Sequence, residues 1–153
     1  MRLFIVQHGH AVAKDVDPDR PLSEQGRHDV EMLEEYLATH NVEVGQVFHS
    51  GKTRARETAE ILQPLLAPDG RIDARENLAP NDSPEALLRE VQDGDEDILV
   101  ASHMPFVARA VSLALTGEPE RELVHFVPGA VAGIERGSDT AWRLFLFVRP
   151  DQM

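Results

Sequence analysis

Hydrophobic residues along the chain occur in short runs separated by polar segments, and several of these runs predict buried strands. A run of about four to eight apolar residues bounded by polar or turn-forming residues is typical of a strand covered on both faces. The last two runs flank an Arg-Gly-Ser-Asp segment, which indicates a hairpin turn between them. The predicted strands are Leu3–Val6, Val44–His49, Asp97–Ser102, Ala130–Glu135 and Ala141–Val148, and Trp142 and Phe145 are interpreted as core residues of the last strand.

Apolar residues at helical spacing predict four helices. In the first of them Val30, Leu33 and Leu37 recur after Ser23, a residue type that commonly caps a helix. Proline at position 64 predicts a kink or an early end of the second helix. The predicted helices run from Ser23 to His40-Asn41, from Lys52 to Leu66, from Ser83-Pro84 to about Val91, and from Pro105 to Gly117.

The order of these elements favours one α/β domain. Strands that alternate with helices form a mostly parallel sheet, because each helix returns the chain to the same end of the sheet. The hairpin near the end of the chain then adds antiparallel strands at one edge. We therefore expect a three-layer α/β/α sandwich with a mostly parallel sheet and an antiparallel C-terminal hairpin, built from residues 1–153 as a single domain.

Composition and charge narrow the class of partner. The chain has 15 Lys and Arg against 27 Asp and Glu, a net charge of −12, which repels nucleic acids and anionic membrane surfaces. It has no cysteine, which excludes thiolate nucleophiles and cysteine-ligated zinc. The apolar run Leu3–Val6 is too short for a signal peptide or a membrane span. We expect a soluble cytoplasmic protein that binds neither nucleic acid nor membrane.

Three of the predicted strands lead into polar residues of the same kind. The first ends in Gln7–His10, the second leads to Arg54, and the third ends at His103. The carboxyl ends of parallel strands lie at one edge of a sheet, where ligands bind in this class of fold. A guanidinium in the first turn of a helix favours an anion, because it and the orphan N–H groups both donate hydrogen bonds. A neutral imidazole in such a site can attack phosphorus.

These residues lie within four motifs that resemble those of the histidine phosphatase superfamily, and are most similar to its SixA-type phosphohistidine phosphatases. The motifs are His8-Gly9, Pro21-Leu22-Ser23-x-x-Gly26, Ser50-x-x-x-Arg54-Ala55-x-x-Thr58 and Ser102-His103-x-Pro105. The resemblance covers nearly the whole chain. It implies a phosphatase that needs no metal or other cofactor and takes part in signal transduction. The implied partner is a phosphorylated protein that carries phosphohistidine, or a small phosphorylated molecule.

The resemblance also implies a role for each residue of the site. His8 is the expected nucleophile, which becomes phosphorylated, and Arg54 and His103 are expected to bind the phosphoryl oxygens. Gly9 lets the backbone approach the substrate closely, because it has no Cβ. Arg20 matches an arginine near the phosphate in SixA-type proteins.

Ser50 and Gln7 complete the expected phosphate site. Ser50 is expected either to form a hydrogen bond in the pocket or to cap the helix that follows it. Gln7 stands where the family has an arginine, so an uncharged amide replaces a charged donor fork. Loss of one charge-assisted hydrogen bond costs about 1.5–3 kcal/mol, which lowers activity roughly ten- to hundredfold.

The proton donor is a second departure from the family pattern. Larger members carry a carboxylate in an extra segment between the second and third motifs, and the corresponding stretch here is short. Glu76 and Asp82 are the candidates in that stretch, or are ordinary surface carboxylates. A phosphohistidine substrate needs such a donor less than an ester does, because its labile P–N bond can break after protonation from solvent.

Two other functions fit the same residues. A phosphate- or phosphoprotein-binding domain with little or no turnover would also replace the family's arginine by Gln7. A metal-dependent hydrolase could use His8 and His10 as ligands, although Arg54 beside them would repel a cation. Inhibition by vanadate or tungstate, together with insensitivity to a chelator, would separate the phosphatase from the metal enzyme.

Overall fold

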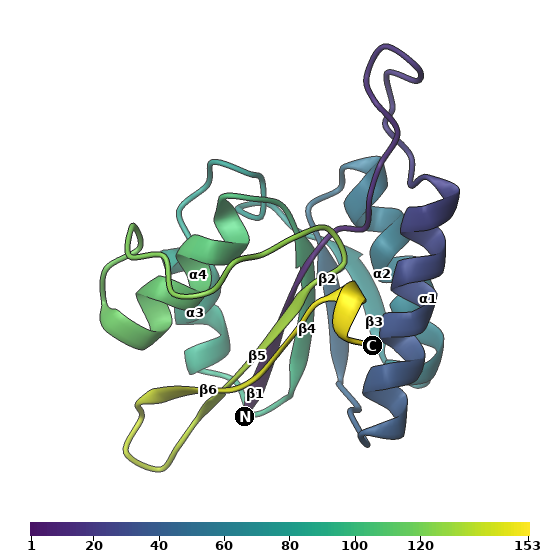
Figure 1. The fold of residues 1–153 in the computed structure, drawn as a ribbon. Helices are drawn as coiled ribbons and strands as arrows, with labels where there is room; N and C mark the ends of the chain where they lie inside the picture. The colour runs from purple at the N-terminus through teal and green to yellow at the C-terminus, as the bar shows by residue number, and fades with distance from the viewer.

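The computed structural model describes all 153 residues, as six strands, four α-helices and a final 3-10 turn (Figure 1). The strands are β1 (Arg2–Gln7), β2 (Gln46–His49), β3 (Arg71–Ala74), β4 (Ile98–Ser102), β5 (Val131–Arg136) and β6 (Trp142–Val148). The helices are α1 (Glu24–Thr39), α2 (Thr53–Leu66), α3 (Glu85–Gln92) and α4 (Phe106–Thr116), and the 3-10 turn is η1 (Pro150–Gln152). The predicted elements therefore exist, with bounds that move by a few residues.

One mixed sheet forms the middle layer of the molecule. Its strand order is β3-β2-β4-β1-β5-β6. The pairs among β3, β2, β4 and β1 are parallel, whereas β5 pairs antiparallel with both β1 and β6. This arrangement confirms the expected fold class, with the C-terminal hairpin at one edge of a mostly parallel sheet.

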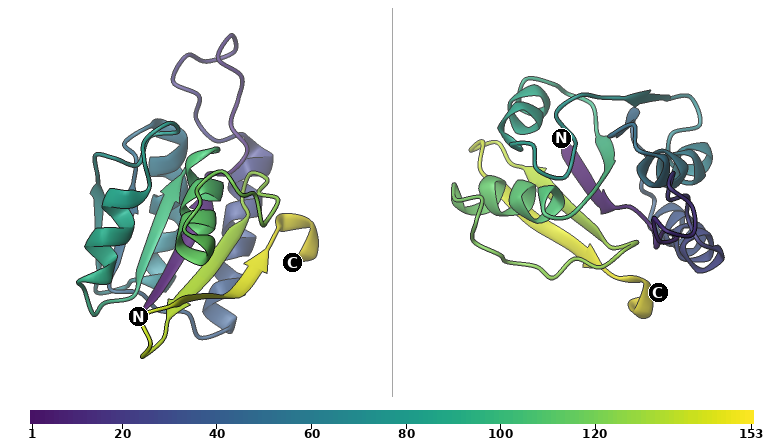
Figure 2. Two further views of the ribbon diagram at one scale, coloured as in Figure 1. Left: turned by 90° about the vertical axis from the view of Figure 1, so that its left-hand side faces the viewer. Right: turned by 90° about the horizontal axis from the view of Figure 1, so that it is seen from above.

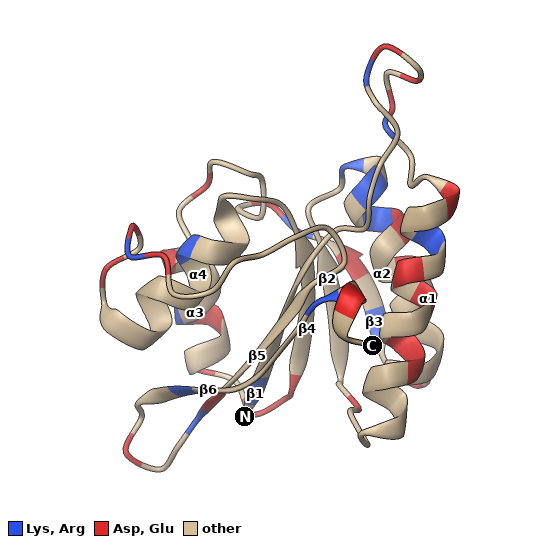
Figure 3. Ribbon diagram, viewed as in Figure 1, with Lys and Arg blue, Asp and Glu red and all other residues tan.

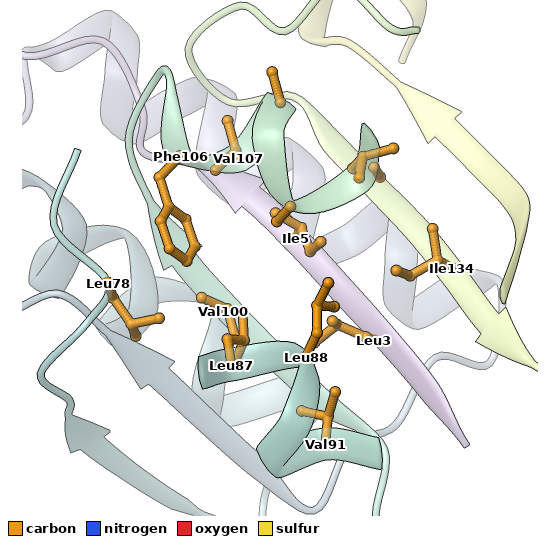
Figure 4. Close-up of a cluster of buried hydrophobic side chains, with 14 of the residues drawn as sticks. Leu3, Ile5, Leu78, Leu87, Leu88, Val91, Val100, Phe106, Val107 and Ile134 are labelled. Atoms are coloured by element: carbon orange, nitrogen blue, oxygen red, sulfur yellow. The ribbon is translucent and has the colours of Figure 1, made fainter. Parts of the chain in front are cut away.

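Helices cover both faces of this sheet (Figure 2). The face under α3 and α4 holds one cluster of buried apolar side chains, shown in part in Figure 4, and the face under α1 and α2 holds a second. Successive side chains of a strand point to opposite faces. In β1, therefore, Leu3 and Ile5 enter the first cluster and Phe4 and Val6 the second. Because all four are fully buried, the core fixes the position of the end of β1.

The predicted helix ends follow their capping residues. The Ser23 hydroxyl oxygen accepts a hydrogen bond from the Gly26 N–H at 3.0 Å, which satisfies one free donor of the first turn of α1. At the end of α4, Gly117 takes a positive φ of 79°, a conformation in which glycine carries no steric penalty. α4 begins shortly after β4 leaves the carboxyl edge of the sheet, whereas residues 8–23 separate α1 from the end of β1.

The structure differs from the sequence-based expectations at particular places. The edge strand β3 is not predicted, because its residues Arg-Ile-Asp-Ala form no apolar run and pair only with β2. α2 continues through Pro64 to Leu66 instead of ending early. Phe145 is 41% exposed rather than part of the core. Its ring packs edge-to-face with the Phe4 ring, with 5.7 Å between the two ring centroids, and covers the backbone of Gly133, which has no side chain.

A loop between β1 and α1, residues 12–21, stands out from the body of the molecule (Figure 1). We call it the finger loop. An antiparallel bridge between Ala11 and Leu22 closes its base, and the Val12 N–H donates to the Pro21 carbonyl at 2.9 Å. None of the helices combines the length and the apolar character needed to cross a bilayer.

Candidate functional site

His8 follows β1 directly, and hydrogen bonds fix both its backbone and its ring. Its N–H donates to the Ser102 carbonyl of β4 at 2.9 Å. Its Nδ1 lies 2.7 Å from the Gly9 carbonyl oxygen, which can only accept, so Nδ1 carries the proton. Nε2 then keeps its lone pair, and the Arg54 Nε–H donates to it at 3.3 Å. The unprotonated nitrogen of His8 therefore faces the guanidinium.

Burial keeps His8 neutral. Desolvation lowers the pKa of His8 from 6.5 to about 4, and the positive charges of Arg54 and Arg20 act in the same direction. The hydrogen bond to the Gly9 carbonyl opposes this shift but does not offset it. At neutral pH the imidazole is consequently in the form that has a lone pair to donate.

His103 follows β4 and lies opposite His8, with the two ring centroids 5.0 Å apart. Its Nε2 lies 2.6 Å from the Ser50 hydroxyl oxygen, which also accepts a hydrogen bond from the Lys52 N–H at 3.3 Å. Its Nδ1 is buried and has no hydrogen-bond partner within the protein. Burial lowers the pKa of His103 to about 3, with smaller effects from the charges of His8 and Arg54. His103 is therefore a buried, neutral ring beside His8, with one nitrogen that the protein leaves unpartnered.

Guanidinium groups lie beside the two imidazoles. Arg54 is in the first turn of α2, and burial together with the charge of Arg20 lowers its pKa. Arg20 comes from the finger loop, where its Nε donates to the Val12 carbonyl at 3.2 Å and its φ is 47°. Figure 3 shows basic positions at the start of α2, next to the carboxyl edge of the sheet, and both basic and acidic positions in the finger loop. The guanidinium groups of Arg54 and Arg20 supply positive charge that favours an anion at this edge.

Gly9 is required where it stands because α1 passes very close to it. A Cβ at this position would lie 2.7 Å from Val30 Cγ2 and 3.0 Å from the Gly26 carbonyl oxygen. The Gly9 N–H donates to the Thr58 hydroxyl at 3.1 Å, and that hydroxyl donates to the Arg54 carbonyl at 2.7 Å. Thr58 thus ties the segment after His8 to the turn of α2 that carries Arg54.

Thr58 is a residue that the sequence analysis does not include among the site residues. It is fully buried, and it lies one helical turn after Arg54, on the same face of α2. That spacing, in a motif already quoted for the resemblance, is the signal that could have identified it.

Gln7 is buried in the last position of β1, and its side-chain carbonyl lacks a partner. The residue is 8% exposed, and no group of the protein donates a hydrogen bond to Oε1. Its neighbour in the sheet register is Ser102, whose hydroxyl is already used to donate to the Leu78 carbonyl at 2.6 Å. The position therefore brings a polar but uncharged group next to the His8 site, as the sequence indicates.

The structure thus brings most of the predicted site residues to one edge of the sheet. The hydrogen bonds and charge effects described above join them into a single cluster. Ser50 contacts the ring of His103, as the first of its two expected roles requires, and α2 begins with no side-chain cap. The residues in the cluster are His8, Gly9, Arg20, Ser50, Arg54 and His103.

Other candidates from the sequence are used differently. The Asp82 carboxylate accepts the Ala79 N–H at 2.9 Å and closes a turn, and no hydrogen bond joins Glu76 to the cluster. His10 is exposed, with its Nδ1 hydrogen-bonded to the Ser23 hydroxyl at 2.8 Å. No three side chains of the His, Asp or Glu type gather as ligands around a common point. In this arrangement neutral imidazoles lie beside guanidinium groups, which can donate hydrogen bonds to an anion.

Comparisons with known proteins agree with this geometry. The family model of the histidine phosphatase superfamily (branch 1) matches residues 3–79. Phosphohistidine phosphatase SixA of Escherichia coli strain K12 is 29% identical over 124 residues, which cover 77% of this chain and 76% of that protein.

Solved structures share the fold over nearly the full length. A structure of protein histidine phosphatase SixA complexed with tungstate superposes with a TM-score of 0.87 at 24% identity, and covers 99% of this chain and 98% of its own. The alpha-ribazole phosphatase of Shigella flexneri superposes with a TM-score of 0.77 at 16% identity, with coverage of 98% and 97%. At these identities the superpositions establish the fold, and the site residues must carry the functional argument.

Proposed function

The chain belongs to the histidine phosphatase superfamily, and from this premise we propose that it hydrolyses phosphohistidine in a protein through a phosphorylated His8. A phosphatase of the histidine phosphatase type is the coarser conclusion that the family membership supports. Phosphohistidine as the substrate is our specific proposal. We also propose that residues 1–153 act as one domain of this type in the cytoplasm, in signalling that uses phosphohistidine.

The observation that carries the proposal is the hydrogen bond between His8 Nδ1 and the Gly9 carbonyl. It places the proton on Nδ1 and leaves the lone pair on Nε2, beside a guanidinium that can hold the phosphoryl oxygens. A histidine held this way is a nucleophile, because a protonated or inverted ring would have no electron pair facing the pocket.

In the first step, the lone pair of His8 Nε2 forms a bond to phosphorus as the bond from phosphorus to the leaving imidazole breaks. The leaving imidazole takes a proton from solvent. While Nε2 bears the phosphoryl group, the His8 ring is positive, and the Gly9 carbonyl that accepts from Nδ1 stabilises that charge. Arg54 and Arg20 stabilise the negative charge on the phosphoryl oxygens.

In the second step, water attacks the phosphorus of phospho-His8. The electron pair of the N–P bond returns to Nε2, inorganic phosphate leaves with the oxygen of water, and His8 is again neutral. His103 contributes its unpartnered Nδ1 to the phosphoryl oxygens in both steps, provided that this nitrogen carries the proton. The Ser50 hydroxyl favours that tautomer when it donates to Nε2.

The test is to replace the nucleophile and follow the phosphate. We expect His8→Ala to abolish hydrolysis of a phosphohistidine peptide and to prevent trapping of labelled phosphate on the protein. The matched control is His40→Ala, because His40 lies at the other end of α1 and is exposed. Retained turnover in His8→Ala would remove His8 from the mechanism.

A phosphate-binding domain without turnover is the second candidate, and Gln7 favours it. Its buried carbonyl occupies the position of the family's arginine, so the pocket has one cation fewer. This candidate predicts that the unmodified protein binds phosphate or vanadate but hydrolyses neither a phosphohistidine peptide nor a small phosphate ester. The same activity measurements, repeated with a chelator, also test the metal-dependent alternative, which predicts loss of activity when the metal is removed.

A further inference from the structure

A groove of about 330 Å³ lies between the start of α1 and the C-terminal segment, and none of its lining residues is used by the reaction described above. One wall is formed by His10 and the first turns of α1, including Asp29, and the other by the C-terminal segment with Arg149 and Pro150. Its floor includes Pro128. The turn η1 lies against α1 in the fold (Figures 1 and 2). We call this feature the flank groove.

The flank groove is continuous with the backbone that carries the nucleophile. The Gly129 N–H donates to the carbonyls of Gln7 and His8, at 3.0 Å and 3.2 Å. A Cβ on Gly129 would lie 3.0 Å from Pro150 Cγ and 3.7 Å from Asp29 Cβ, so both walls meet at this glycine. The groove therefore borders the backbone segment that holds His8, and His10, two residues after His8, is part of its lining.

The groove differs from the phosphoryl site in its charge. The phosphoryl site is surrounded by basic side chains, whereas the half-buried carboxylate of Asp29 lies in the groove wall without a cationic partner. Its one hydrogen bond is to the Gln25 amide, at 2.8 Å. The other carboxylate of the groove, that of Asp151, is paired with Arg149 at 3.3 Å. A ligand that carries an anionic phosphoryl group next to a cationic group would therefore complement both the phosphoryl site and the groove wall at Asp29.

We propose that the flank groove binds the polypeptide next to the phosphorylated residue of a protein substrate, and that Asp29 pairs there with a lysine or arginine of that polypeptide. The inference rests on the proposed function. Proline and valine side chains in the groove suit the apolar stem of such a residue, while its charged head reaches Asp29. A net charge of −12 on the chain also favours a basic partner over an acidic one.

The groove's size separates this occupant from a small phosphate ester. A phosphoryl group alone fills only the cluster around His8, whereas the flank groove has room for a further side chain or two. Asp29 consequently acts on the specificity for the flanking residue and makes no contact with the reacting phosphorus.

The experiment compares two phosphohistidine peptides that differ only in one residue beside the phosphohistidine, lysine in one and alanine in the other. We expect the unmodified protein to prefer the lysine peptide by about tenfold in kcat/KM, as an interfacial ion pair worth about 1.4 kcal/mol requires. Asp29→Asn should abolish this preference, so that the two peptides are hydrolysed with about equal kcat/KM. Asp29→Lys should reverse it toward a third peptide that carries glutamate. Glu31→Lys, the same charge change on an exposed position of α1 outside the groove, should leave the preference unchanged.

The outcomes separate the groove from the proposed function. Equal rates for the lysine and alanine peptides in the unmodified protein, or a preference that survives Asp29→Asn, overturn the groove assignment while phosphohistidine hydrolysis stands. If no peptide is hydrolysed and no phosphate reaches His8, the proposed function is wrong. The groove assignment is then tested by measuring the affinity for the same peptides made with a non-hydrolysable phosphohistidine analogue. A tenfold preference for the lysine peptide supports the groove assignment, and equal affinity for the two peptides overturns it.

Discussion

At the scale of single residues, Gln7 is the position where the proposed phosphoryl site has an uncharged amide instead of the family's arginine. Its buried carbonyl faces no donor, and an arginine at this position would add a charged fork. We expect Gln7→Arg to raise kcat/KM for a phosphate ester roughly ten- to hundredfold, corresponding to about 1.5–3 kcal/mol. Gln92→Arg, an exposed position at the end of α3, is the control for added charge. An unchanged or reduced rate in Gln7→Arg would refute this account of the pocket.

Ser50 acts at the same scale, through the ring of His103. Removal of its hydroxyl frees the His103 Nε2 and lets the proton move between the two ring nitrogens. We expect Ser50→Ala to lower kcat/KM about three- to tenfold, the value of one hydrogen bond between neutral groups. Ser50→Thr should restore most of the loss. The nitrogen chemical shifts of His103 report the tautomer directly, and identical shifts in Ser50→Ala and the unmodified protein would contradict this role.

At the scale of elements, the approach of α1 to the segment after His8 depends on Gly26. A Cβ there would lie 2.0 Å from the His10 carbonyl oxygen. Because this is a steric clash with backbone, it can be relieved only if α1 moves away. We expect Gly26→Ala to destabilise the protein by about 1–3 kcal/mol, measured by urea unfolding, and to lower activity with it. Gly94→Ala is the matched control, because the nearest atom to its added Cβ is 3.9 Å away. Equal stability of the two variants would show that α1 does not need the close contact.

The elements were predictable from the sequence where local chemistry decides them. Ser23 marks the start of α1 and Gly117 the end of α4, because a cap and a left-handed turn each need a particular residue type. β3 was not predictable, because an edge strand covered on little of its surface needs no apolar run. Phe145 was misread for a related reason. Its ring lies over Gly133 of the neighbouring strand, and a contact between strands leaves no trace in the local pattern.

At the scale of the whole molecule, the neutral buried histidines make the folded state sensitive to acid. The pKa values of His8 and His103 are lowered to about 4 and about 3, while an unfolded histidine has a pKa near 6.5. Between these values the unfolded chain binds more protons than the folded one, so stability falls as the pH drops from about 6.5 toward 4. We expect the urea midpoint of the unmodified protein to fall more steeply between about pH 7 and pH 5 than that of a variant with His8→Asn and His103→Asn. Parallel slopes would mean that these two rings are not neutral when folded.

The site also shows how far sequence alone can reach at this scale. His8, Arg54 and His103 could be assigned to one place because parallel strands bring their carboxyl ends to a common edge. Thr58 has a sequence signal in its spacing from Arg54, but its hydrogen bond to the Gly9 N–H depends on how α2 packs against the segment after His8. The flank groove has no such signal, since it depends on how segments far apart in the chain pack together. The groove joins the start of α1 to the last turn of the chain, more than 100 residues later.

The closed base of the finger loop has a consequence for the order in which the site comes apart. The amide of His8 is bonded to β4 in the middle of the sheet, so we expect it to exchange with solvent only when the entire fold opens. The finger loop is held by its own short-range contacts and can open without disturbing the sheet. Arg20 therefore lies in a segment that can open locally, while His8 stays bonded to β4. We expect amides of residues 12–21 to exchange with solvent faster than the His8 amide.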